Sequence, residues 1–274
     1  MNPFSIYHTH QPEFTQGQQS IVEQMVTIAQ PHAIYLLGAS RLSRRSESIF
    51  MQQAPASSYI SHCFYLLLMP ANTGKTMDQW QDQLEHAIDA LPFTVLPIPA
   101  DTFKDWLHQG HPFACNLHRQ APPLYKSPGF ILEEIVPPPL PTQANEKEHA
   151  HAIRLAKEFV AGAELYIIRK EYRLASFMLH QAAEQSLHSL IQQRMGYAAN
   201  IHSIERLLRY ASLVSYELPD VFNAALPSDQ KLLDLLQKSY VAARYRPDFT
   251  IKEYELERLL QKVKRILQIG ERYL

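Results

Sequence analysis

The sequence has little cysteine and no long apolar run. Its 274 residues include only Cys63 and Cys115, too few for a disulfide framework. No stretch approaches the roughly 20 apolar residues that a membrane-spanning helix needs. The residues after Met1 lack the basic start and apolar centre of a signal peptide. We therefore expect a cytoplasmic protein, in a reducing compartment and without a membrane segment.

Net charge is also nearly absent. The formal value of −1 gives the whole chain no field that would attract nucleic acid. The two halves differ, because residues 1–141 hold 7 Lys/Arg against 11 Asp/Glu and residues 142–274 hold 19 against 16. This mild asymmetry indicates two units more than it indicates a partner.

A proline-rich stretch, VPPPLPTQANEKEHA, begins at Val136 and divides the chain. Consecutive prolines exclude helix and sheet pairing and favour a stiff extended linker. After Pro141 only Pro219, Pro227 and Pro247 remain, each where a helix could begin or end. We predict a first domain over residues 1–136, a linker over 137–146 and a second domain over 147–274.

The second part shows the spacing of amphipathic helices. Apolar residues recur at three and four, as at Leu232, Leu235 and Leu236. Gly196 is placed to end one helix and Ser228 to cap another. Short connections between long helices favour antiparallel neighbours, so we predict an up-down bundle. The predicted helices span residues 146–170, 172–195, 203–215, 228–243 and 251–273.

The first part mixes strands and helices, which makes the whole chain α+β. Strand-like runs are HAIYLLG, which ends at Gly38, then CFYLLLM and FTVLPI. Helices are predicted over residues 20–29, 78–90 and 101–110. We expect Asp101 to cap the last of these and Gly110 to end it.

Gly74-Lys75-Thr76 follows a strand-like run and precedes a predicted helix, as in a phosphate-binding P-loop. That motif requires another glycine five positions before Gly74, where this chain has Met69 followed by Pro70. Proline has no N–H to offer a phosphate, and the turn would lack its glycine. We therefore interpret the stretch as an ordinary strand-to-helix connection.

IYLLGASRLSRRSESIF followed by SHCFYLLLMP resembles the polymerase-beta-like minimal nucleotidyltransferases. In those enzymes a strand ends at a glycine turn beside the triphosphate, and a later strand carries paired carboxylates that hold Mg²⁺. The resemblance implies a phosphate-binding role for Gly38, Ser40, Arg44 and Arg45.

The carboxylates of that family are missing here. The corresponding strand offers His62 and Phe64, and no Asp or Glu lies between Ser48 and Asn72. Magnesium needs hard oxygen ligands. We therefore expect a degenerate domain, or pseudoenzyme, that uses no Mg²⁺ or other metal and transfers no adenylyl group, with a nucleotide as its one candidate ligand.

RLASFMLHQAAEQSLHSLI, NIHSIERLL and LLDLLQKSYVAARYRPDF resemble the HEPN domains (higher eukaryotes and prokaryotes nucleotide-binding). The resemblance covers most of residues 147–274 and implies a helical bundle that dimerises and binds a nucleotide or RNA. The corresponding binding candidates are Arg244, Arg246 and Glu184. Active members share an R-x(4–6)-H motif. Arg244 matches its arginine, but Phe249, Thr250 and Ile251 stand where the histidine would be.

Three functions remain open from these residues. The first is noncatalytic binding of a nucleotide or RNA by a homodimer. The second is a ribonuclease of the toxin type with Arg244 as its catalytic group. The third is a protein-interaction scaffold without a small ligand. Arg244 has a structural alternative as well, an ion pair with Glu184 or Asp234.

Two further patterns have ordinary explanations. His180, Glu184 and His188 follow one another at four-residue intervals, so they share one helix face. The two histidines lie about 12 Å apart along the axis, too far to share one ion. A pair four residues apart could bind one with a ligand from elsewhere, but we interpret all three as residues that line the bundle. The basic residues of the last helix are interpreted as a solvated face: Lys262, Lys264, Arg265 and Arg272.

Overall fold

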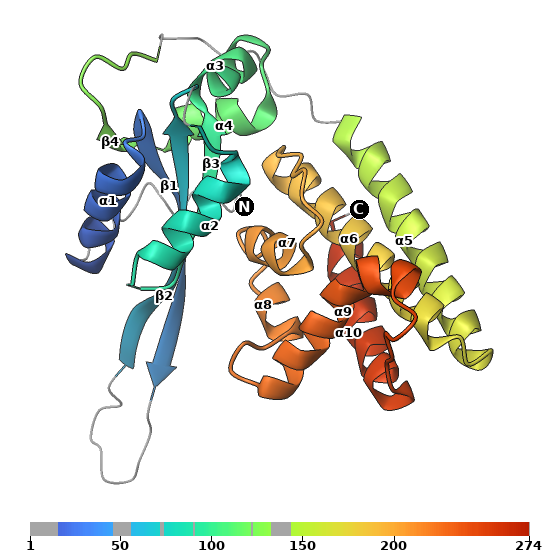
Figure 1. Cartoon of the computed structure of the whole chain (residues 1–274). Helices are drawn as coiled ribbons and strands as arrows, with labels where there is room; N and C mark the ends of the chain where they lie inside the picture. Colours follow the sequence, from blue (N-terminus) through green and yellow to red (C-terminus); the bar gives the residue numbers. More distant parts are fainter. Residues whose placement is uncertain are drawn as a thin grey trace, which may run out of the picture. The chain divides into compact units, whose positions relative to one another are not determined.

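Figure 1 shows a computed structural model of the chain, which divides into two compact units on either side of residue 140. The structure describes residues 16–45, 56–71, 74–89, 91–121, 123–132 and 144–273. The first unit contains a mixed sheet with helices, and all the secondary-structure elements described in the second unit are helices. The predicted α+β class is confirmed.

The first unit contains a four-stranded sheet. Strands β1 (Ala33–Arg45), β2 (Ala56–Met69), β3 (Phe93–Pro99) and β4 (Pro123–Lys126) lie in the order β3-β2-β1-β4. β1 is antiparallel to β2 and to β4, whereas β2 and β3 are parallel. Parallel neighbours need a crossover connection, and helix α2 (Met77–Ala87) provides it.

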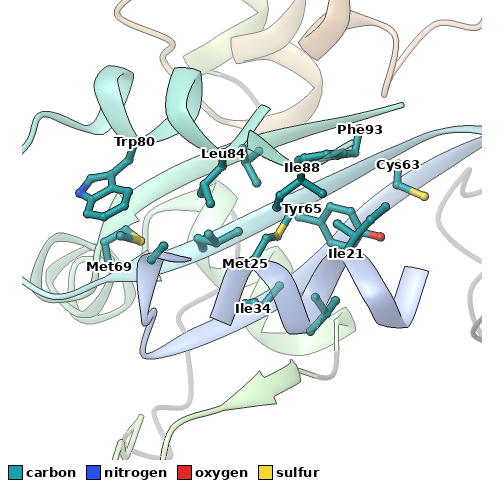
Figure 2. Close-up of a cluster of buried hydrophobic side chains, with 14 residues drawn as sticks. Ile21, Met25, Ile34, Cys63, Tyr65, Met69, Trp80, Leu84, Ile88 and Phe93 are labelled. Atoms are coloured by element: carbon teal, nitrogen blue, oxygen red, sulfur yellow. The ribbon is translucent and has the colours of Figure 1, made fainter. Parts of the chain in front are cut away.

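Helices cover both faces of this sheet. On one face, α1 (Gln16–Ala29) and α2 pack side chains such as Met25 and Leu84 against Tyr65 and Met69 of β2 (Figure 2). On the other face lies α3 (Ala100–His108), whose Phe103 ring is 6.5 Å from that of Tyr35. α4 (Pro112–Gln120) packs against α3. Residues 63–69 of β2 are therefore all buried, as expected for a strand with helices on both faces of its sheet.

Thr76 explains the Gly-Lys-Thr stretch. Its Oγ1 accepts a hydrogen bond of 3.3 Å from the Gln79 backbone N–H, and the Gln79 side chain accepts one of 2.9 Å from the Thr76 N–H. This reciprocal pair is a capping box, which satisfies two N–H groups at the start of α2. The sequence motif is thus a helix start.

Several predicted boundaries in the first unit are wrong. The strand expected to end at Gly38 continues to Arg45, because β2 supplies a partner for every residue from Ser40 onward. Asp101 does not cap α3, since the helix already begins at Ala100 after Pro99. β4 and α4 were not predicted as elements. Short polar strands such as β4 gain their identity from a pairing partner, which local sequence does not show.

The second unit is built around one central helix. α6 (Tyr172–Met195) contacts α5 (Ala144–Ile168), α7 (Ile204–Ala211), α9 (Pro227–Tyr245) and α10 (Glu253–Glu271). α5 and α6 form a helical hairpin, and α8 (Leu218–Val221) follows α7. Half of the residues of α6 are buried as a result, including polar ones. No helix among the described residues is long and apolar enough to span a membrane.

The helix ends of the second unit test two expectations. Gly196 ends α6 with a left-handed backbone (φ 70°), so the predicted glycine stop is confirmed. Ser228 is not the cap of α9, because Pro227 already occupies the first helical position and Leu226 precedes it. Proline favours that position because its missing N–H would have no partner there.

Candidate functional site

Glu184 lies at the centre of a polar cluster inside the helical unit. It stands midway along α6 and is only 6% exposed. Its Oε1 accepts a hydrogen bond of 2.6 Å from Nδ1 of His202, and its Oε2 accepts one of 3.1 Å from Nε2 of Gln181. His180 Nδ1 lies 3.6 Å from Oε2. A buried carboxylate requires such hydrogen-bond donors, because burial has removed the water molecules that would otherwise solvate its charge.

His202 is held by this carboxylate, although its own side chain is 62% exposed. The ring stacks on Tyr240 at 5.3 Å with an interplanar angle of 11°. In the tautomer whose Nδ1 donates to the Glu184 carboxylate, a neutral His202 carries its lone pair on Nε2. No hydrogen bond within the described part of the chain engages Nε2. In that tautomer the ring presents a proton-accepting nitrogen at the surface.

Arg244 stands one helical turn beyond Tyr240 on α9. Its Cζ lies 4.4 Å from the centre of the Tyr240 ring, 5.1 Å from that of Tyr245 and 5.3 Å from that of Phe177. Nε donates a hydrogen bond of 2.8 Å to the Tyr240 carbonyl oxygen. We call Arg244 and these three rings the arginine–aromatic cluster. The guanidinium is exposed, and its terminal nitrogens have no carboxylate partner among the described residues.

The structural alternative for Arg244 is therefore not found. Glu184 bonds to His202 and Gln181, and no ion pair joins Arg244 to Asp234 in the described ranges. Arg246 follows the last turn of α9, where its backbone N–H bonds to the Ala242 carbonyl, and its side chain is exposed. Both arginines are thus open to solvent at the end of one helix.

His180 is fully buried beside Glu184, with its ring 5.0 Å from that of Tyr240. Burial is the main cause that lowers the pKa of His180 to about 4; the negative charge of Glu184 opposes this shift, and the positive charge of Arg244 contributes to it in a small degree. Burial also lowers the pKa of His188, whose Nε2 donates a 2.8 Å hydrogen bond to the Ile201 carbonyl. Both rings are therefore neutral at pH 7.

Both histidines lie near Glu184: His180 Nδ1 is 3.6 Å from Oε2 and His188 Nε2 is 3.9 Å from Oε1. His188 also bonds to the Ile201 carbonyl oxygen, just before His202. Among the residues that the structure describes, no group of three His, Cys, Asp or Glu side chains is placed to hold a metal. Hydrogen bonds from His202 to Glu184 and from His188 to the Ile201 carbonyl oxygen instead hold the connection from α6 to α7.

The basic residues of α10 are engaged in ion pairs. Lys262 bonds to Asp229 at 2.8 Å, and Lys264 bonds to Glu164 at 2.5 Å. Arg265 and Arg272 both bond to Glu217, and the hydrogen bond from Arg272 lowers the pKa of that carboxyl. These charges therefore tie α10 to its neighbours, in contrast to the guanidinium of Arg244.

In the first unit, the predicted phosphate-binding residues lie along β1. Gly38 pairs with Phe64 and Ser40 pairs with His62, so the glycine is inside a strand and not at a turn. His62 Nε2 lies 2.8 Å from Oγ1 of Thr94 on β3. Arg44 and Arg45 pair with Ser57 and Ala56 near the end of the β1–β2 ribbon. The structure thus separates the two arginines from Gly38 along the strand.

Sequence reasoning missed His202 as a member of the site. Because no histidine follows Arg244 at the motif spacing, the motif histidine was taken to be missing from the site. The contact of His202 with Glu184 joins positions 18 residues apart. The only signal was its position in NIHSIERLL, just before the predicted helix at residue 203.

Comparison with known proteins supports the assignment of the second unit. Residues 150–273 match the family model described as HEPN domain. The comparison with curated proteins finds no match. A solved structure, described as the crystal structure of TT1696 from Thermus thermophilus, is 26% identical, with a TM-score of 0.35, and the match covers 46% of this chain and 98% of that one. The nucleotidyltransferase resemblance of the first unit stays a prediction.

Burial of His180 predicts a pH dependence of stability. Between pH 6.5 and about 4 the unfolded chain binds a proton at this ring while the folded chain does not, so stability falls as pH falls. At pH 5 the loss attributable to His180 is on the order of 2 kcal/mol. Urea unfolding at pH 7.5 and at pH 5 gives the change in the free energy of unfolding between the two pH values. This change should be smaller for His180→Gln than for the parent protein, and equal changes would contradict a buried neutral ring.

Proposed function

We propose that the helical unit binds the phosphate of a nucleotide or an RNA at Arg244 and does so without catalysis. The observation that carries this proposal is the exposed guanidinium held against three aromatic rings. Within the described residues, its Nε is the one guanidinium nitrogen that is hydrogen-bonded, to the Tyr240 carbonyl oxygen. The remaining N–H groups form the planar donor pair that matches two phosphate oxygens.

The aromatic rings prepare this arginine for binding. Stacking restricts the guanidinium before a ligand arrives, so less side-chain entropy is lost on association. Tyr245 is 71% exposed and offers a ring face on which a base can stack. A HEPN domain over residues 150–273 supports a role with nucleotides or RNA.

The first unit contains a second candidate phosphate site in this proposal. We extend the proposal to the first unit as a degenerate nucleotidyltransferase-like domain, in which His62 and Phe64 would occupy the strand positions of the metal-binding carboxylates. Any phosphate contact there involves Gly38, Ser40, Arg44 or Arg45 without Mg²⁺. Because these residues are distant in sequence from Arg244, separate variants distinguish the two candidate sites.

Arg244→Ala is expected to weaken the binding of ATP, GTP, their mono- and diphosphates or short RNA oligomers by about 10- to 100-fold, the effect of losing one or two charge-assisted hydrogen bonds. Fluorescence titration and thermal shift measure this, each with and without Mg²⁺. Arg244→Lys should recover only part of the affinity, because lysine lacks the planar fork.

Arg194→Ala is the matched control, since Arg194 also lies over a ring, that of Tyr273 at 5.0 Å. It should leave binding unchanged. Loss of binding in Arg44→Ala instead would move the site to the first unit. If no ligand binds the parent protein, the scaffold interpretation replaces this proposal.

The Glu184–His202 pair favours a second candidate function, metal-independent cleavage of RNA. The histidine that the R-x(4–6)-H spacing lacks in sequence is available in space from the connection before α7. His202 Nε2 would remove the proton from a ribose 2′-hydroxyl, whose oxygen then attacks the adjacent phosphorus as the bond to the 5′-oxygen breaks. The departing 5′-oxygen takes a proton from water, and Arg244 offsets the charge that develops on the phosphate.

An RNA cleavage assay in EDTA separates the two functions. Our first proposal predicts that the parent protein binds labelled RNA and leaves it intact. Cleavage that disappears in His202→Asn, while this variant still binds RNA, would establish the second. Cleavage that survives in His202→Asn would point to a contaminating nuclease.

We also propose that the bundle self-associates. Apolar side chains are exposed around the turn between α5 and α6, with Leu165 53%, Ile168 78% and Leu174 38% accessible. Such residues favour burial against a second copy. Light scattering should give twice the chain mass of 31.6 kDa, and Ile168→Glu should return a monomer. A parent protein of single-chain mass at micromolar concentration would refute self-association.

A further inference from the structure

The first unit contains a cavity of about 460 Å³ at one end of the strands of its sheet. At this end β2, β3 and β4 finish and β1 begins. The cavity is lined by the residues just outside the four strands: Ala71, Ala100, His32 and Ser127. Its volume lies in the range of small-molecule sites.

Sheet topology accounts for the position of this cavity. The chain leaves β2 toward α2, which packs on one face, and leaves β3 directly into α3, which packs on the other. Adjacent parallel strands whose following helices lie on opposite faces leave a crevice outside their carboxyl ends, and ligands of open α/β sheets bind there. The cavity lies at that crevice, whereas Gly38 and Ser40 pair with the middle of β2.

The wall formed by residues 127–131 is held in place. His32 and Phe130 stack at 4.8 Å with their planes 1° apart. The Ser127 N–H donates to the His32 carbonyl oxygen at 2.8 Å, and the Phe130 N–H donates to the Ser127 carbonyl oxygen at 3.2 Å. Gly129 supplies the left-handed backbone (φ 81°) of this turn. The cavity is thus formed in the absence of a ligand.

Lys104 supplies the positive charge of the cavity. Its Nζ lies 5.4 Å from the centre of the Phe130 ring and 3.8 Å from Oδ1 of Asp101. The two side chains are 40% and 71% exposed, and such an exposed pair at that distance is weak. The ammonium group therefore remains available to an anion, for which Asp101 is a competitor.

Apolar surface lies beside this charge. Ile131, which is 70% exposed, lines the cavity together with Ala71 and Ala100. A phosphate or carboxylate alone would leave that surface uncovered. A ligand with an apolar ring beside its anionic group would cover it.

We propose that this cavity binds a small organic anion, a phosphate or a carboxylate that carries a flat apolar group. The oxyanion contacts Lys104 and the Ser127 hydroxyl, and the apolar group packs against Phe130 and Ile131. The proposal stands on the cavity and its lining. It does not depend on the Arg244 site, which lies in the other unit.

Phenyl phosphate, benzoate and inorganic phosphate are the probes, titrated against the full chain by calorimetry and by NMR of ¹⁵N-labelled protein. We expect phenyl phosphate or benzoate to bind in the millimolar range or tighter and at least tenfold more tightly than inorganic phosphate. The stronger of the two identifies the oxyanion. Shifted amide signals should include those of Ser127, Gly129 and Phe130.

Two substitutions with opposite expected effects test the contact. Lys104→Ala should weaken the binding of the stronger probe at least fivefold, because the cation is lost. Asp101→Asn should tighten it about two- to fivefold, because a competing carboxylate is removed. Lys75→Ala is the matched control, since Lys75 also lies over a ring, that of Trp80, outside the cavity.

The proposal fails if neither organic anion binds at 10 mM, or if Lys104→Ala binds as tightly as the parent protein. It also fails if Lys75→Ala weakens binding as much as Lys104→Ala does. Arg244→Ala should leave these titrations unchanged, so this result and the result for the Arg244 site are read independently.

Discussion

The helical unit depends on the burial of one carboxylate. Glu184 sits in the middle of the central helix, where α6 is covered on most sides, and a charged group there is tolerated only if its oxygens are hydrogen-bonded. Gln181 on the same helix supplies one bond, and His202 supplies the other from outside it. The second bond fixes the chain after α6, since His202 can reach Glu184 only if the connection to α7 turns back along the helix. His188 reinforces that turn through the Ile201 carbonyl.

This constraint extends to the exposed residues of the candidate site. His202 stacks on Tyr240, and Tyr240 in turn supports Arg244 through its ring and its carbonyl oxygen. A buried acid thereby positions a histidine and, through one ring, an arginine on another helix. The site is therefore assembled from α6, α9 and the segment between α6 and α7, all of which are held by the same core. Its geometry follows from packing and not from a flexible loop.

The sequence predicted most of the helices and, within the site, Glu184 and Arg244, but it predicted neither His202 nor the aromatic rings. The bounds of α6 were predicted correctly because apolar spacing and a glycine stop are local signals. The length of β1 was underestimated because its outer half is polar and is held by pairing with β2. Pro227, and not Ser228, begins α9, although both are ordinary start residues. His202 was overlooked because a motif search counts residues along one segment, whereas its bond to Glu184 depends on how two helices pack.

The charges around Arg244 also explain why an anion could bind there although the carboxylate of Glu184 is buried nearby. Hydrogen bonds from His202 and Gln181 engage both oxygens of Glu184, so its negative charge is partly offset. His180, which lies against it, is neutral at pH 7 because of its burial. Arg244 contacts aromatic rings, whose faces attract a cation without cancelling its charge. The outward side of the cluster therefore presents a full positive charge, and a phosphate there meets a guanidinium that no carboxylate of the described chain neutralises.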